Sequence, residues 1–300
     1  FPRLKMAGYP VGHSAALISS ASVLGMLIPP SSIMILYAWV GNQSVLASFL
    51  ASVIPGIILM ILLSLINMWL LRNNSDIKTA DKVDFTTLGK LLGQRTLKAS
   101  PALTMPLLVL GGIYGGIMTP TEAAAMAVLY AIPIAFFVYK GLNLKGLLNV
   151  LVETATTTGV IMVMLYTVMI LSRLYIMENL PGTIMDFLTA ISTNKYVLLI
   201  MINIFMIIIG MLMDDVSAVL LSTPILLPIV IQLGVSPVQF AAIVGVNLGM
   251  GNITPPTAPL LYLGGRISGA RINDMLYPSL IMIIFGWLPT LLLTTYVPSL

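Results

Sequence analysis

The stretch Leu24–Tyr37 reads LGMLIPPSSIMILY, and Met250–Leu263 reads MGNITPPTAPLLYL. Each places two adjacent prolines inside a long apolar segment. Proline has no N–H donor and its ring clashes with the preceding helical turn, so one proline inside a helix costs about 3 kcal/mol or more. Two adjacent prolines therefore predict an unwound helix, and this chain carries that pattern twice.

The composition predicts a membrane protein. Hydrophobic residues make up 58% of the 300 residues and charged residues 8%, and the mean hydropathy is +1.04. A soluble domain has about 25% charged residues. Several apolar runs reach the roughly 20 residues that a helix needs to cross a bilayer. We therefore expect an all-α, polytopic membrane protein.

The two Pro-Pro segments align without gaps at a constant offset of 226 residues, from Pro29 to Pro255. Gly25 then aligns with Gly251, and Ser31 with Thr257. Internal repeats of this kind are typical of secondary transporters. The alignment predicts two structural repeats, each with a Pro-Pro-unwound transmembrane helix. The alternative is a pair of simple proline kinks.

Unwound backbone inside a membrane is tolerated where protein buries it or where it lines a cavity, and its free carbonyls can coordinate a cation. We therefore expect two Na⁺ sites built from oxygen ligands. The first comprises Gly25, Ile28, Pro29, Pro30, Ser31 and Ser32, and the second comprises Asp214, Ser217, Thr223, Gly249, Gly251, Asn252, Thr254 and Pro255.

Other polar residues in apolar surroundings leave alternatives open. Asp214 and Asp215 provide either a carboxylate for Na⁺ or a polar turn. Thr156, Thr157 and Thr158, with Asn247 and Thr257, are candidates for the substrate path. Threonine hydroxyls can equally bond to carbonyls of their own helix. Thr119, followed by Pro120 and Glu122, predicts a capping box at a helix start.

The distribution of basic residues predicts the topology. Arg3 and Lys5, the polar segment 72–100, and Lys140 with Lys145 all fit a cytoplasmic location. We expect residues 1–71 to hold the rest of the first repeat, with an unwound helix over 14–40, and 72–100 to form a cytoplasmic amphipathic segment. Residues 101–195 are expected to be connecting or scaffold helices. The second repeat is expected over 196–300, with an unwound helix over 238–263 and a final helix over 276–297.

The sequence argues against an enzyme. The motifs H-E-x-x-H and G-x-S-x-G and the P-loop are absent, and His13 is the only histidine. The net charge of +4 fits the cytoplasmic loops of a membrane protein, so we expect no nucleic-acid partner. Without cysteine, the chain has no disulfide or thiolate metal site.

Four motifs together resemble the large membrane subunit of a tripartite ATP-independent periplasmic (TRAP) transporter. They are LGMLIPPS (24–31), GGIYGGIMTPTEAAAMAVLYA (111–131), GMLMDDVSAVLLSTPILLPIV (210–230) and NLGMGNITPPTAPLL (247–261). The resemblance implies an elevator-type, Na⁺-coupled importer of an organic acid in the bacterial inner (cytoplasmic) membrane. It implies a small membrane subunit and a periplasmic substrate-binding protein as partners, contact with membrane lipid, and no cofactor besides Na⁺ as coupling ion.

The resemblance also implies a re-entrant helical hairpin in each repeat, the second at residues 210–233. The family's first hairpin has no counterpart upstream of Gly8 in these residues, so we expect either a fragment or a missing part on another polypeptide. The second break reads PPTAP where relatives commonly have PPxG. The alternative functions are a binding-protein-independent carboxylate or anion transporter and a truncated, inactive permease.

Overall fold

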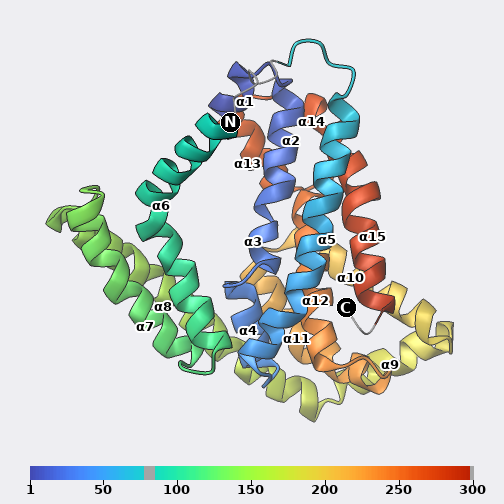
Figure 1. The fold of residues 1–300 in the computed structure, drawn as a ribbon. Coiled ribbons are helices and arrows are strands. Elements are labelled where there is room, and N and C mark those ends of the chain that lie inside the picture. The colour runs from blue at the N-terminus through green and yellow to red at the C-terminus, as the bar shows by residue number, and fades with distance from the viewer. Residues whose placement is uncertain (78–84, 298–300) are drawn as a thin grey trace. The chain divides into compact units, whose positions relative to one another are not determined.

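The computed structural model describes residues 1–77 and 85–297 (Figure 1). Regular secondary structure in these ranges is helical throughout, which confirms the all-α prediction for the described residues. The helices are α1 (Pro2–Met6), α2 (Val11–Ser22), α3 (Leu24–Leu27), α4 (Ser32–Val40), α5 (Val45–Leu71), α6 (Phe85–Tyr114), α7 (Pro120–Pro133), η1 (Ile134–Val138), α8 (Leu144–Met177), α9 (Leu180–Ile191), α10 (Lys195–Leu212), α11 (Asp215–Gln232), α12 (Pro237–Ile253), α13 (Pro259–Ser268), α14 (Ile272–Met282), η2 (Ile283–Trp287) and α15 (Leu288–Tyr296).

The chain forms two compact units. Unit 1 consists of Phe1–Lys78 and Met164–Leu300, and unit 2 consists of Thr79–Val163. Unit 1 therefore contains both Pro-Pro segments. Unit 2 contains α6, α7, η1 and the first part of α8.

Helix α12 forms the centre of unit 1. Every residue from Phe240 to Ile253 is buried. Its main neighbours are α10, α5, α15 and α11, and it also contacts α3 and α4. A membrane helix enclosed on all sides can carry small and polar residues, because it presents no face to lipid. This explains why α12 contains three glycines and two asparagines.

Unit 1 also brings the helix that precedes the first Pro-Pro pair against the helices that follow the second pair. Helix α2 packs against α13 and α14 through small residues. A Cβ on Gly12 would lie 2.5 Å from the Asp274 carbonyl oxygen, and a Cβ on Gly264 would lie 2.1 Å from Ser19 Oγ. At Gly12 the opposing atoms include backbone, so only glycine permits the approach there, whereas at Gly264 the Ser19 side chain would have to turn away.

The expected second hairpin corresponds to two helices of 18 residues each, α10 and α11, joined by a short turn. Met213 and Asp214 alone join α10 to α11. The range 210–233 thus contains the end of α10, the turn and α11, while the first arm begins earlier, at Lys195. Asp214 begins α11 as its N-cap, since its carboxylate accepts a hydrogen bond from the backbone N–H of Ser217 at 3.1 Å.

Unit 2 confirms the predicted capping box. Thr119 Oγ1 accepts from the Glu122 N–H at 3.3 Å, and a Glu122 carboxylate oxygen accepts from the Thr119 N–H at 2.7 Å. Part of the surface segment expected at 72–100 lies outside the described residues. From Phe85 onward this segment is helical, and α6 continues without interruption to Tyr114.

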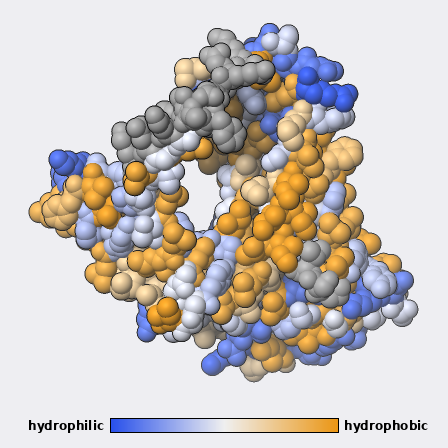
Figure 2. Space-filling model, in the orientation of Figure 1, coloured by the Kyte–Doolittle hydropathy of each residue, from blue (hydrophilic) through white to orange (hydrophobic). Residues whose placement is uncertain are grey.

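The described helices include six that are long and apolar enough to cross a membrane: Val45–Leu71, Pro120–Val138, Leu144–Met177, Lys195–Leu212, Asp215–Gln232 and Ile272–Tyr296. A seventh candidate is the pair Val11–Leu27 and Ser32–Val40 taken as one span, with a bend of 42° at the break between them. Figure 2 shows hydrophobic side chains along α5, where Ile57, Leu65 and Trp69 are exposed. The chain is therefore a multi-pass membrane protein.

Candidate functional site: two broken helices and a hairpin turn

The first break interrupts the helical path between α3 and α4. Helix α3 ends at Leu27, and Ile28 is extended, with φ −88° and ψ 117°. The Pro29–Pro30 peptide bond is cis, and Ser31 is again extended before α4 begins. The Ser31 hydroxyl donates to the Met26 carbonyl at 2.7 Å. The Met26 carbonyl thus receives a hydrogen bond from a side chain of the same broken segment.

The second break has matching backbone geometry. Helix α12 ends at Ile253, which is 226 residues after Leu27, and Thr254 has φ −88° and ψ 122°. Pro255–Pro256 is again cis. Here the hydroxyl comes from Thr254, which donates to the Met250 carbonyl at 2.5 Å. Ala258 has a positive φ of 33° before α13 begins.

Both breaks leave backbone carbonyls free at equivalent positions. The carbonyl oxygens of Leu27 and Pro29 accept no hydrogen bond from the described part of the chain, and the same holds for Ile253 and Pro255. The backbone leaves the helical path at Ile28 and Thr254, so the N–H groups four residues further along no longer point back at these carbonyls, and for Pro255 that position is occupied by Pro259, which has no N–H. Unpaired carbonyls at membrane depth are suitable ligands for a hard cation.

The turn between α10 and α11 lies against the second break. Asn252 Nδ2 donates to Asp215 Oδ1, which joins the first residue of α11 to the penultimate residue of α12. The neighbouring Asp214 is exposed and serves as a helix cap, since its Oδ1 also accepts from Ser217 Oγ at 2.5 Å. The carboxylate that faces the break is therefore that of Asp215, which was absent from the predicted ligand set.

Several predicted site residues have packing contacts or their own hydrogen bonds. A Cβ on Gly251 would lie 2.6 Å from the Gly210 carbonyl carbon, and one on Gly249 would lie 2.6 Å from Val23 Cγ1. Thr223 is buried, and its hydroxyl donates to the Val219 carbonyl. The two glycines therefore allow helices to approach closely.

The remaining predicted residues lie at different places. Gly25, Ile28, Pro30, Ser32 and Thr257 are exposed, whereas Pro29 is buried. The candidates for the substrate path separate into two groups. Thr156, Thr157 and Thr158 are exposed on α8 in unit 2, where Thr156 and Thr157 donate to the Val152 and Glu153 carbonyls of their own helix. Asn247 is buried in unit 1 and bonds to Asn203 of α10.

The donor set at the second break suits a hard cation. It contains the amide of Asn252, the hydroxyl of Thr254, the carboxylate of Asp215 and the free carbonyls of Ile253 and Pro255. Within the described residues, no group of three or more His, Cys, Asp and Glu side chains could hold a metal ion. Oxygen ligands suit hard cations, whereas soft metals prefer sulfur and imidazole nitrogen.

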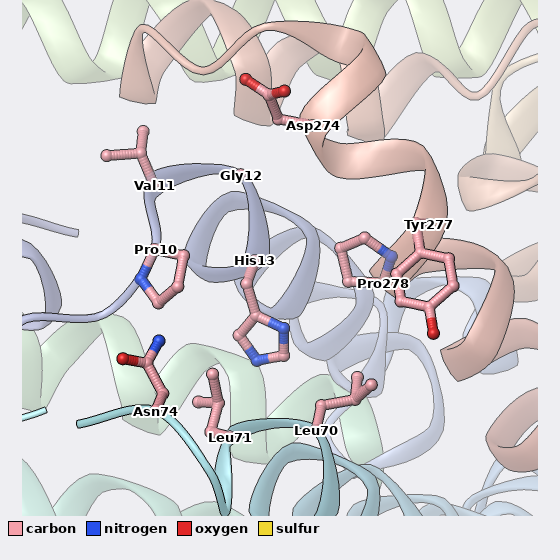
Figure 3. A pocket seen from close by; sticks show the side chains of 10 residues that line it. All are labelled: Pro10, Val11, Gly12, His13, Leu70, Leu71, Asn74, Asp274, Tyr277 and Pro278. Carbon is pink, nitrogen blue, oxygen red and sulfur yellow. The ribbon is translucent and has the colours of Figure 1, made fainter. Parts of the chain in front are cut away.

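A pocket of about 410 Å³ lies away from both breaks, between α2, α5 and α14 (Figure 3). His13 projects into it from the first turn of α2, beside Leu70 and Leu71. His13 Nε2 lies 2.8 Å from Asn67 Oδ1, so the single histidine links α2 to α5. This contact gives His13 a structural role.

Two apolar helical paths, each interrupted by a Pro-Pro pair, with a hairpin turn packed on one interruption, are typical of a polytopic membrane protein of the secondary-transporter type. Over residues 1–300 the chain matches the family described as tripartite ATP-independent periplasmic transporter, DctM component. The chain belongs to this family, which confirms the resemblance identified in its motifs. Members of the family are transporter permease components, so the prediction of a non-enzyme is also confirmed.

Three relatives illustrate the similarity. The isethionate TRAP transporter permease protein DctMQ of Oleidesulfovibrio alaskensis is 35% identical over 298 residues, which cover 99% of this chain and 46% of that protein. The C4-dicarboxylate TRAP transporter large permease protein DctM of Pseudomonas aeruginosa is 32% identical, with coverage of 98% and 67%. The sialic acid TRAP transporter large permease protein SiaM of Vibrio cholerae is 32% identical, with coverage of 91% and 62%. The chain thus spans about half to two thirds of these relatives.

Proposed function

We propose that this chain is part of the large permease subunit of a Na⁺-coupled transporter that imports an organic acid. The observation that carries the proposal is the contact between Asp215 and Asn252, which packs the hairpin turn onto the second broken helix. The break next to this contact has free carbonyls, and the first break has free carbonyls at the equivalent positions. A cation bound there would neutralise charge and hold the turn and the break together.

The second Na⁺ site is proposed to use the Asp215 carboxylate, the Asn252 and Thr254 side chains, and the carbonyls of Ile253 and Pro255. Asp214 and Ser217 then support the site from the start of α11 by fixing the turn. The first site is proposed to use the carbonyls of Leu27 and Pro29 and the Ser31 hydroxyl oxygen, which keeps a lone pair for a cation while it donates to Met26.

The substrate is proposed to be an organic anion. The names of the relatives give C4-dicarboxylates, sialic acid, isethionate and 2,3-diketo-L-gulonate as their substrates. These compounds share an acidic group and differ in the rest of the molecule. Co-transported Na⁺ would offset the cost of moving such an anion through the bilayer.

The assembly is proposed to follow the family. The partners would be a small TRAP membrane subunit and a periplasmic substrate-binding protein, in the bacterial inner membrane. The matching breaks support two structural repeats, and motion of the broken helices with the hairpin against a fixed scaffold would provide alternating access in the manner of an elevator. Because the chain spans only part of its relatives, we assign this activity to the intact permease.

Thermal unfolding of the purified intact permease in Na⁺, K⁺ or choline at equal ionic strength tests the proposal. A ligand that binds only the folded state adds about 2.7 kcal/mol at 100 times its Kd. We expect a Na⁺-specific rise in melting temperature, and Na⁺-driven uptake after reconstitution with a binding protein. Asn252→Ala and Thr254→Ala should each weaken the Na⁺ response, while Ser64→Ala, on the exposed side of α5, should not. Equal melting temperatures in the three salts would contradict Na⁺ coupling.

A further inference from the structure

Besides Asn252, two side-chain amides lie buried in the described helices of unit 1: Asn203 in α10 and Asn247 in α12. Asn203 is 5% exposed and Asn247 is 0% exposed. Asn247 Nδ2 donates to Asn203 Oδ1 at 2.9 Å, and Asn203 Nδ2 donates to Thr295 Oγ1 at 3.0 Å. One chain of hydrogen bonds therefore joins α12, α10 and α15, and Asn203 is its middle member.

The two helices joined by the amides each lead into one half of the proposed second site. Helix α10 ends at Leu212, immediately before the hairpin turn, and α12 ends at Ile253, where the break begins. The contact between Asp215 and Asn252 consequently depends on how far α10 and α12 are shifted along each other. A slide by one residue moves a helix by about 1.5 Å, which is enough to break a hydrogen bond of normal length.

The glycine contact between these helices sets their distance. A Cβ on Gly251 would lie 2.6 Å from the Gly210 carbonyl carbon and 2.8 Å from the Ile207 carbonyl oxygen. Contacts between small residues allow close approach but have little directional preference. A hydrogen bond between two buried amides is directional, and a single buried asparagine pair is known to fix the register of paired helices.

We propose that Asn203 is a positioning residue for Na⁺ binding at the second break. Its bond to Asn247 sets the register of α10 against α12, and that register brings Asp215 to Asn252. Its bond to Thr295 extends the same register to α15. Gln239 supports this end of the network, since its Nε2 donates to the carbonyls of Thr294 and Thr295 at 3.1 and 3.0 Å. The inference rests on the proposed Na⁺ coupling and adds a residue distant from the ligands.

The test compares Asn203→Leu with the double variant Asn203→Leu/Asn247→Leu in the intact permease. In the single variant the buried Asn247 amide keeps its bond to the Ile243 carbonyl at 2.9 Å but loses the acceptor for its other N–H, and the Thr295 hydroxyl loses its donor, so we expect a lower melting temperature without Na⁺. Replacing both amides removes the unpaired N–H of Asn247 and leaves only the Thr295 hydroxyl without its partner, so the Na⁺-free melting temperature should return part of the way towards the wild-type value. The Na⁺ response should stay impaired in both the single and the double variant. If about a tenth of the molecules keep the register of α10 against α12 that binds Na⁺, the apparent Kd for Na⁺ should be about tenfold higher than in the wild type.

Two further variants complete the test. Thr290→Val removes a buried hydroxyl that bonds only to the Gly286 carbonyl of its own helical turn, so the apparent Na⁺ Kd should stay within about twofold of wild type. Asn203→Ser has a side chain too short to reach Asn247, so it should also raise the apparent Na⁺ Kd about tenfold. This variant tests the positioning role if the leucine variants do not fold.

The outcomes separate the two proposals. If the double variant recovers its melting temperature and its Na⁺ affinity together, or if Asn203→Ser binds Na⁺ as wild type does, Asn203 is only a structural residue and the inference is wrong. If the wild-type permease itself does not respond to Na⁺, the proposed coupling fails, and the positioning role fails with it. A recovered melting temperature with a persistently raised Kd supports the inference.

Discussion

Substitution of Gly251 by alanine should destabilise the permease, although alanine is the better helix former. In the interior of a helix alanine is favoured over glycine by about 1 kcal/mol. At this site its Cβ would lie 2.6 and 2.7 Å from the Gly210 C and Cα atoms, where ordinary contacts begin at 3.4 Å. The three nearest opposing atoms all belong to backbone, so no side chain can turn away from them and α10 must move by several tenths of an ångström.

Overpacking of a tight interior costs about 1–3 kcal/mol, and a rigid backbone contact belongs at the upper end of that range. After subtraction of the helix-propensity gain, we expect a net loss of about 1–2 kcal/mol. This corresponds to a melting temperature lower by roughly 2–8 °C, at about 2–4 °C per kcal/mol for a chain of this size. The Na⁺-induced shift should shrink as well, because the displaced α10 carries the hairpin turn.

The matched control is Gly159→Ala in α8, where an added Cβ has no heavy atom within 4 Å. This variant should melt at or slightly above the wild-type temperature, because only the helix-propensity gain of up to about 1 kcal/mol remains. Thermal unfolding of the three proteins in one detergent measures both effects. If Gly251→Ala were as stable as Gly159→Ala, the close crossing of α10 and α12 would be refuted.

Three further predictions concern single contacts. Asp215→Asn should weaken the Na⁺-dependent rise in melting temperature several-fold. Asp214→Asn should mainly weaken the helix cap, at a cost of about 1 kcal/mol in stability. Equal losses of the Na⁺ response in the two variants would contradict this division of roles. Tyr37→Phe removes a hydroxyl that donates to the Pro237 carbonyl at 2.6 Å from a fully buried ring, so unfolding measurements should find a loss of about 1 kcal/mol. Thr119→Ala should cost a similar amount through the loss of the capping box, and an unchanged melting temperature would refute that role.

Local features of the fold could be predicted from the sequence because their causes are local. The two Pro-Pro pairs end helices at Leu27 and Ile253 for reasons that lie within a single turn. The Thr119 capping box likewise depends on residues three positions apart. Composition and run length were sufficient for the all-α membrane class, because a bilayer imposes its own thickness on the apolar segments.

The candidate site was harder to predict, because it depends on contacts between distant segments. Asp214 is the extended N-cap and Asp215 is the first residue of α11, so their side chains point in different directions. The sequence left their roles open, and the structure places Asp214 at the cap and Asp215 beside Asn252. Asn203 was missed altogether. A single amide in the run KYVLLIMINIFMIIIGML (195–212) was a usable signal, because a buried amide needs a partner.

The enclosure of α12 has a consequence for biogenesis. Its neighbours include α10, made earlier in the chain, and α15, which follows it. The buried amides therefore stay open to lipid or water on one side until Leu288–Tyr296 has been synthesised and docked. During synthesis the central helix is thus sealed only after α15 has been made, and loss of α15 should direct the nascent permease towards proteolysis rather than leave a stable core.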